Sequence, residues 1–169
     1  MHNTQAIEGV TLASFAFQEN AHILSIFSKE HGRIKCVTKS YKKALTRGYC
    51  PLLGVEMQVI VSEKELWKCK ECIVTTSYPS LRRSLSTLRH VAEITDLLNR
   101  LLPLHHALPE LYSLYSQFLA EAANQEPAYH AACLFLEKFL IIEGMLDKER
   151  GSTDLGYYNQ LIQIAKGGT

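Results

Sequence analysis

The apolar pattern of this 169-residue chain changes its period near residue 76. Before that point apolar and polar residues alternate, as in strands with one buried face; after it, apolar residues recur every three to four positions, as in helices. Glycine follows the same division, because four of the nine glycines lie within residues 1–54 and the next is Gly144. We therefore predict an α+β chain, with a strand domain over residues 1–76 and a helical bundle domain over residues 77–169.

Five segments of the first domain have the composition of strands. The second and third are separated only by the short glycine-containing link 29–32, which predicts a hairpin. Five strands in so few residues favour a small, strongly curved antiparallel barrel over an open sheet. The predicted strands are residues 10–17, 22–28, 33–39, 55–61 and 66–75.

Helices are predicted from residue 79 onward. Pro79 suits a first helical turn, and Ser77 is the candidate cap before it. An apolar stripe that includes Leu85 follows, and Pro103 ends this helix. Three further helices are predicted at residues 108–123, 127–143 and 155–165, of which the 127–143 helix should be central and buried.

The charges are unevenly distributed along the chain. The net charge is +1 overall, but +3 for residues 1–76 and −2 for the remainder. Because side chains alternate along a strand, Arg33, Lys35 and Lys39 should share one face, with Ile34, Cys36 and Thr38 on the other. One face of the barrel is therefore predicted to be cationic.

This basic face continues into the loop that carries Lys42, Lys43 and Arg47, where Tyr41 and Tyr49 interleave with the charges. A basic groove with aromatic neighbours is typical of small barrels that bind single-stranded nucleic acid. The alternative is a solvated lysine face that serves solubility alone. Charge by itself leaves both interpretations open.

Other candidate sites lack the groups that their chemistry requires. Cys69 and Cys72 are three residues apart on a predicted strand, which places them on opposite faces, and no second Cys-x-x-Cys completes a metal site. His105 and His106 lie in a connector between helices, which we expect to be exposed. We expect no metal and no cofactor.

Catalysis is not expected either. His22 or His31 beside Cys36 would lack an oxyanion hole and an orienting carboxylate, and the sequence contains no phosphate-binding loop or dinucleotide fingerprint. The five cysteines are scattered, which favours free thiols in a reducing compartment. No signal peptide is visible at the N-terminus, and the apolar run 139–142 is too short to cross a bilayer. We expect a soluble, cytoplasmic, non-enzymatic protein that does not bind membranes.

Two blocks of sequence resemble the RecO family of recombination mediators. The first is Glu30-His-Gly-Arg33 within residues 23–39, followed by the basic loop; the second is Pro79-Ser-Leu-Arg82. Residues 52–59 are also similar, and the resemblance covers roughly residues 5–145.

The resemblance implies an OB-fold barrel followed by a helical domain. It also implies binding of single- and double-stranded DNA, strand annealing, and joint action with RecR in loading RecA onto strands coated by single-strand binding protein. Such a protein would act in DNA repair at the nucleoid. The DNA-contacting residues that it implies coincide with the cationic face, namely Arg33, Lys35, Lys39, Lys42, Lys43 and Arg47.

The sequence departs from the family in two respects. Many relatives carry a four-cysteine zinc site after the third long helix, whereas no cysteine follows Cys133 here, so no zinc site is expected. The chain also ends at Thr169, earlier than the family usually does, which leads us to expect either that the protein lacks the last helices or that this sequence is a shortened form of it.

Two alternatives to a DNA-binding mediator follow from the residues. One is a protein-interaction module, a shortened relative that docks RecR or single-strand binding protein without useful DNA affinity. The acidic helical half is compatible with that alternative. The other is a thiol enzyme that uses Cys36 or Cys69.

Overall fold

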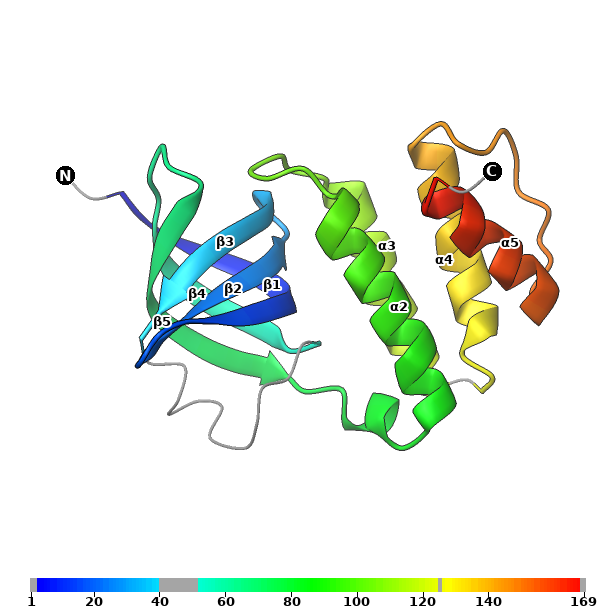
Figure 1. Ribbon diagram of the computed structural model, residues 1–169, viewed down its shortest axis with the longest axis horizontal. Helices are drawn as coiled ribbons and strands as arrows, with labels where there is room; N and C mark the ends of the chain where they lie inside the picture. Colours follow the sequence, from blue (N-terminus) through cyan, green and yellow to red (C-terminus); the bar gives the residue numbers. More distant parts are fainter. Residues whose placement is uncertain (1–2, 40–51, 125, 168–169) are drawn as a thin grey trace. The chain divides into compact units, whose positions relative to one another are not determined.

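A computed structural model describes residues 3–39, 52–124 and 126–167 of the chain. Five strands come first and helices follow (Figure 1). The strands are β1 (Thr4–Gln18), β2 (Ala21–Ser28), β3 (Gly32–Thr38), β4 (Gly54–Ile60) and β5 (Leu66–Thr76). The helices are the short 3-10 helix η1 (Pro79–Arg82) and the α-helices α2 (Leu85–Leu101), α3 (Pro109–Asn124), α4 (Tyr129–Ile142) and α5 (Leu155–Ala165).

The five strands close into a barrel in the order β1-β2-β3-β5-β4. All neighbouring strands are antiparallel except β3 and β5, which run parallel, with Val37 opposite Lys68. The interior is filled by a cluster of buried side chains that includes Leu24, Ile34 and Trp67. The predicted OB-fold barrel followed by helices is confirmed.

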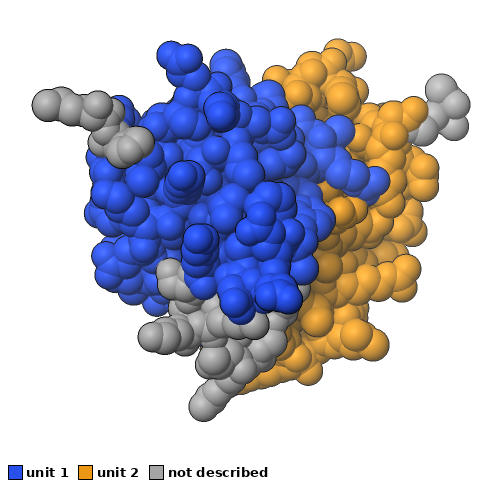
Figure 2. Space-filling view, turned by 60° about the vertical axis from the view of Figure 1, so that its left-hand side comes forward, with its two compact units in different colours: residues 1–77, 98–112 blue, residues 78–97, 113–169 orange. Residues whose placement is uncertain are grey.

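The chain divides into two compact units, coloured separately in Figure 2. The first contains residues 1–77 together with 98–112, and the second contains residues 78–97 and 113–169. Inside the first unit, the segment 98–112 is bonded to the barrel. The Ser25 hydroxyl donates a hydrogen bond to the Asn99 side-chain carbonyl at 2.6 Å, and the ring of Phe27 meets that of Tyr112 edge to face.

The second unit is built on α4, whose predicted burial is confirmed. The rings of Phe135 and Phe139 stack with their centroids 6.0 Å apart, and the ring centroid of Phe118 of α3 lies 5.2 Å from that of Phe135. Glu137 is also buried, and its carboxylate accepts a hydrogen bond from the Tyr157 hydroxyl of α5. The α5 helix begins as a capped helix should, since the Asp154 carboxylate accepts the backbone N–H of Tyr157 at 2.8 Å.

The first helical segment differs from the prediction. The single helix expected from Pro79 is interrupted after η1, and α2 starts only at Leu85. The reason is local capping, because the Ser84 hydroxyl accepts the backbone N–H of Thr87. Leu85 therefore lies in the exposed first turn of α2, with 84% of its surface accessible, and its predicted place in the apolar stripe is wrong.

Candidate nucleic-acid interface

The two faces of β3 are separated as the alternation predicts. Ile34, Cys36 and Thr38 are buried, whereas Arg33, Lys35 and Lys39 lie on the outer side. The outer cations nevertheless have different surroundings at the two ends of the strand. We call Arg33 and Lys35 the anchored end, because the side chains of both are bonded to other residues of their own unit.

Arg33 is bonded to its own unit through both its side chain and its backbone. Its Nε donates a hydrogen bond to the carbonyl of Leu102 at 2.8 Å, and its carbonyl accepts the backbone N–H of His105 at 2.8 Å. Partial burial lowers the pKa of Arg33, against an opposing effect of Glu65. The guanidinium therefore holds the segment 98–112 on the barrel.

Lys35 is also occupied. Its ammonium donates a hydrogen bond to the carboxylate of Glu65, which forms an ion pair on the barrel surface. That hydrogen bond, together with the attraction of the lysine charge, lowers the pKa of Glu65. A phosphate would have to compete with Glu65 for this lysine.

At the other end of β3, Lys39 faces a hollow of about 560 Å³ on the barrel surface. β5 contributes Lys68 and Lys70, both exposed, and β1 contributes the exposed ring of Phe17. No carboxylate in the described part of the chain pairs with Lys39 or Lys68, and Lys70 donates a hydrogen bond to the Thr4 hydroxyl at 3.1 Å. This cationic hollow is lined by Phe17, Val37, Lys39, Ile60, Leu66, Trp67, Lys68, Cys69 and Lys70.

Sequence reasoning found Lys39 but missed Lys68 and Lys70. Part of the alternation around them was visible, since the two lysines stand on either side of Cys69 and Lys68 follows Trp67. Their link to Lys39 depends on the parallel pairing of β3 with β5, which joins residues about 30 positions apart. The other predicted contacts, Lys42, Lys43 and Arg47, lie outside the described residues.

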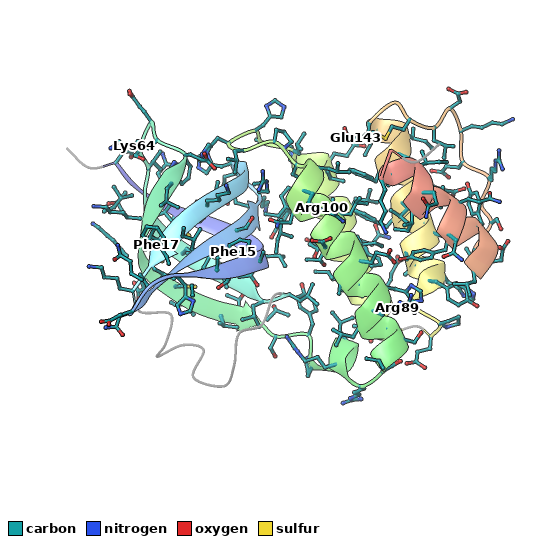
Figure 3. All side chains as sticks on the ribbon, viewed as in Figure 1. Phe15, Phe17, Lys64, Arg89, Arg100 and Glu143 are labelled. Carbon is teal, nitrogen blue, oxygen red and sulfur yellow. The ribbon has the colours of Figure 1, made fainter. Side chains whose placement is uncertain are left out.

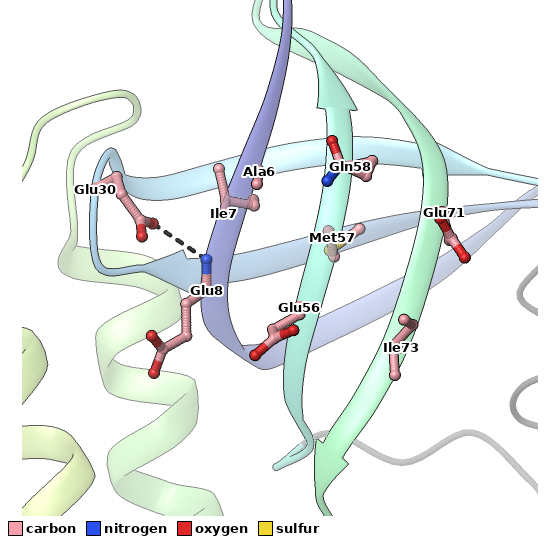
Figure 4. A pocket seen from close by; sticks show the side chains of 9 residues that line it. All are labelled: Ala6, Ile7, Glu8, Glu30, Glu56, Met57, Gln58, Glu71 and Ile73. Atoms are coloured by element: carbon pink, nitrogen blue, oxygen red, sulfur yellow. Dashed lines mark hydrogen bonds between the residues drawn. The ribbon is translucent and has the colours of Figure 1, made fainter.

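A second hollow on the same barrel has the opposite charge (Figure 4). It measures about 240 Å³ and lies over β1, β4 and β5. Four carboxylates line it, and the backbone N–H of Glu8 donates a hydrogen bond to Glu30 at 3.2 Å. The lining residues of this acidic hollow are Ala6, Ile7, Glu8, Glu30, Glu56, Met57, Gln58, Glu71 and Ile73.

The charge changes sign within one strand. Lys68 and Lys70 of β5 line the cationic hollow, whereas Glu71 and Ile73 line the acidic one. The change coincides with a β-bulge, because the register to β4 shifts between Cys69 and Glu71 and leaves Lys70 unpaired. The bulge directs the exposed side chains of two consecutive residues to different surfaces.

Comparison with known proteins identifies the barrel. Residues 1–78 match the family model described as Recombination protein O N terminal. Residues 1–78 belong to the RecO family. The resemblance drawn from the sequence is thereby confirmed.

RecO proteins of several bacteria are similar over most of the chain. DNA repair protein RecO of Geobacter metallireducens is 26% identical over 140 residues, which cover 81% of this chain and 57% of the relative. The RecO of Acaryochloris marina is 27% identical over 154 residues, or 85% of this chain and 50% of the relative. The chain spans about half the length of the curated relatives it matches.

The paired cysteines of this RecO-family barrel do not lie as predicted. Because of the bulge, Cys69 and Cys72 both pack against the barrel core, so the expectation of opposite faces is wrong. Burial raises the pKa of Cys69 to about 11 and that of Cys72 to about 12, and it raises the pKa of Cys36 as well. Within the residues that the structure describes, no group of His, Cys, Asp or Glu is arranged to hold a metal ion.

The histidines of the barrel have structural partners. His31 Nε2 is 2.8 Å from the side-chain oxygen of Gln5, and its ring meets Trp67 edge to face. His105 is exposed as predicted, yet its ring stacks on Trp67 at 4.8 Å. Across the described ranges, no helix is long and apolar enough to cross a membrane.

Proposed function

We propose that this chain is a DNA-binding mediator of recombinational repair that acts without catalytic turnover. The observation that carries the proposal is the cationic hollow, where three exposed lysines surround apolar and aromatic side chains on an OB-fold barrel. Lysines of this kind follow the phosphates of a strand, and OB-fold barrels present such surfaces to oligonucleotides. The name shared by its relatives, DNA repair protein RecO, supports the same function.

In this proposal the barrel binds both single- and double-stranded DNA and promotes annealing of complementary strands. It works with RecR, and it helps to load RecA onto strands covered by single-strand binding protein. Its site of action is the nucleoid. None of these steps requires a cofactor or a metal from the chain.

We assign the DNA contacts among the described residues to Lys39, Lys68 and Lys70. Lys42, Lys43 and Arg47 stay predicted contacts, since they follow Lys39 directly in the sequence. Arg33 and Lys35 are given a supporting role, because Arg33 bonds to a backbone carbonyl and Lys35 to a carboxylate, whereas Lys70 bonds only to a neutral hydroxyl.

One observation favours a second candidate function, a docking platform for RecR or single-strand binding protein without useful DNA affinity. The anchored end of β3 offers DNA little free charge, since Leu102 and Glu65 occupy its two cations. On this alternative the cationic hollow would be too small a charge cluster to hold DNA. The experiment below separates the two functions.

The test is fluorescence anisotropy of a fluorescein-labelled single-stranded oligonucleotide over a salt series. For the wild type we expect the logarithm of the affinity to fall linearly with the logarithm of the salt concentration. The variant K39Q/K68Q/K70Q should lower the slope by about 0.7 for each lost phosphate contact, or about 2 in all. The matched control E8Q/E56Q/E71Q, which neutralises three carboxylates of the acidic hollow, should keep the wild-type slope.

An unchanged slope in the lysine variant would refute the assigned surface. A wild-type chain that binds no oligonucleotide even at low salt would refute the DNA-binding function. In that case, recovery of RecR in a pull-down without DNA would support the docking platform.

A further inference from the structure

The phenylalanines of this chain are divided sharply by burial. Four of the six are almost fully buried, with exposed fractions between 0% and 2%. The other two, Phe15 and Phe17, are 53% and 48% exposed, and they lie two residues apart near the end of β1 (Figure 3). Exposing a large aromatic side chain forgoes the free energy of its burial, so two such rings together point to a ligand.

The strand register connects these rings to the cations. Phe15 lies opposite Ile23 of β2, Ile23 opposite Val37 of β3, and Val37 opposite Lys68 of β5. Residues directly opposite one another in a sheet project to the same side. The row therefore carries an aromatic ring at one end and a free ammonium at the other.

Phe17 lies beside the lysines, because it lines the cationic hollow together with Lys39, Lys68 and Lys70. The rings and the lysines thus belong to one continuous outer surface of the barrel. The other residues that line this hollow are apolar, and the one carboxylate of β5, Glu71, lines the acidic hollow instead.

We propose that Phe15 and Phe17 form a base-stacking platform that makes the cationic hollow prefer single-stranded over double-stranded nucleic acid. The inference rests on the proposed function and adds the determinant of strand preference. Lysines contact phosphates in single and double strands alike, whereas a ring can stack only on a base that is free of its duplex. The phosphates would follow Lys39, Lys68 and Lys70 while unpaired bases lie on the two rings.

An acidic apolar peptide offers the same two chemistries, negative charge and apolar surface. The ring of Phe15 lies at one end of the row across the four strands and Lys68 at the other, and this separation favours nucleic acid, in which bases and phosphates lie on opposite sides of the strand. We therefore assign the surface to a single strand, and the test includes an outcome that would overturn this in favour of a protein partner.

The test compares three labelled ligands of equal length: a single strand, its duplex, and a single strand with abasic residues throughout the central part. The variant F15A/F17A should bind the intact single strand at least about tenfold more weakly, because stacking on a ring contributes on the order of 1–3 kcal/mol per base. Its affinity for the duplex and the abasic strand should change less than about twofold, since those contacts are to phosphates.

The control variant is I73A, which removes a side chain that is 54% exposed but lines the acidic hollow. It should leave the affinity for all three ligands unchanged. The conservative variant F15Y/F17Y retains both rings and should restore the preference for the intact single strand. Because the phenylalanines are half exposed, circular dichroism should show that F15A/F17A folds as the wild type does.

The failure of this inference differs from failure of the proposed function. If F15A/F17A binds all three ligands as the wild type does, with the same salt dependence, the rings have another purpose and a protein partner becomes the better assignment. If the wild type binds none of the ligands, the DNA-binding function itself is wrong.

Discussion

The two ends of β3 carry the same kind of side chain in different surroundings. At the anchored end, Arg33 bonds to the Leu102 carbonyl and Lys35 to the Glu65 carboxylate. At the other end, Lys39 is exposed in a hollow that it shares with Lys68 and Lys70. A cation on a strand is more available to a phosphate where its own fold supplies no carboxylate or buried carbonyl to bind it; Lys70 bonds only to the Thr4 hydroxyl. We therefore expect changes at the anchored end to alter stability, and changes in the cationic hollow to alter DNA affinity.

The largest effect on stability should come from Gly32, next to Arg33. Its φ is +67°, and an added Cβ would lie 1.8 Å from the carbonyl oxygen of His106, a backbone atom that cannot move aside. G32A should lower the free energy of unfolding by about 3 kcal/mol or more, as measured by urea denaturation.

Gly144 provides the matched control for this substitution. It has nearly the same φ, +70°, but no atom within 4 Å of an added Cβ. G144A should therefore lower the free energy of unfolding by only about 1 kcal/mol, because alanine there is disfavoured by the left-handed backbone conformation alone. Equal losses in both variants would contradict the close packing of the segment 98–112 on the barrel.

The next largest effect should come from R33Q. The substitution removes the guanidinium that satisfies the Leu102 carbonyl, and an unpaired, partly buried carbonyl costs about 1–3 kcal/mol. K35Q serves as the control, because its surface ion pair with Glu65 should contribute less than about 1 kcal/mol. If R33Q were as stable as the wild type, the anchoring role of Arg33 would be wrong.

A smaller effect is expected on the inner side of β5, where the thiols are neutral. Burial raises the pKa of Cys69 to about 11 and of Cys72 to about 12, above the value of about 8.5 for an unfolded chain. Between those values the folded state binds more protons than the unfolded state, so stability is complete below pH 8.5 and falls as the pH rises.

Denaturation at pH 8 and pH 10 measures this loss, which we expect to be about 1 kcal/mol after allowing for partial exposure. C69S/C72S should show a smaller loss than the wild type, because hydroxyl groups do not ionise in this range. The buried tyrosines are present in both proteins and cancel in the difference. An identical loss in the two proteins would mean that the thiols are not shielded as described.

Much of the fold could be predicted because the period of the apolar residues depends on local geometry. The faces of β3 and the burial of α4 follow from alternation and helical spacing alone. The bulge in β5 could not be predicted in this way. A single extra residue reverses the alternation. Strict alternation therefore predicts opposite faces for Cys69 and Cys72, although both pack against the core.

The availability of each cation was also beyond the sequence. Arg33 and Leu102 are 69 positions apart, and only the closed fold brings the guanidinium to that carbonyl. The same holds for the rings of Phe15 and Phe17, since exposed and buried phenylalanines look alike in a strand pattern. Local patterns identified the cationic face, and long-range pairing decided which of its charges are free.

The most direct test compares the salt dependence of single-strand binding for two matched double variants of the barrel. K39Q/K68Q removes two free cations of the hollow, and R33Q/K35Q removes the two anchored ones. We predict that the slope of log affinity against log salt falls by about 1.4 in K39Q/K68Q and stays at the wild-type value in R33Q/K35Q. Equal reductions in the two variants, or a larger one in R33Q/K35Q, would contradict the division between anchored and free charges.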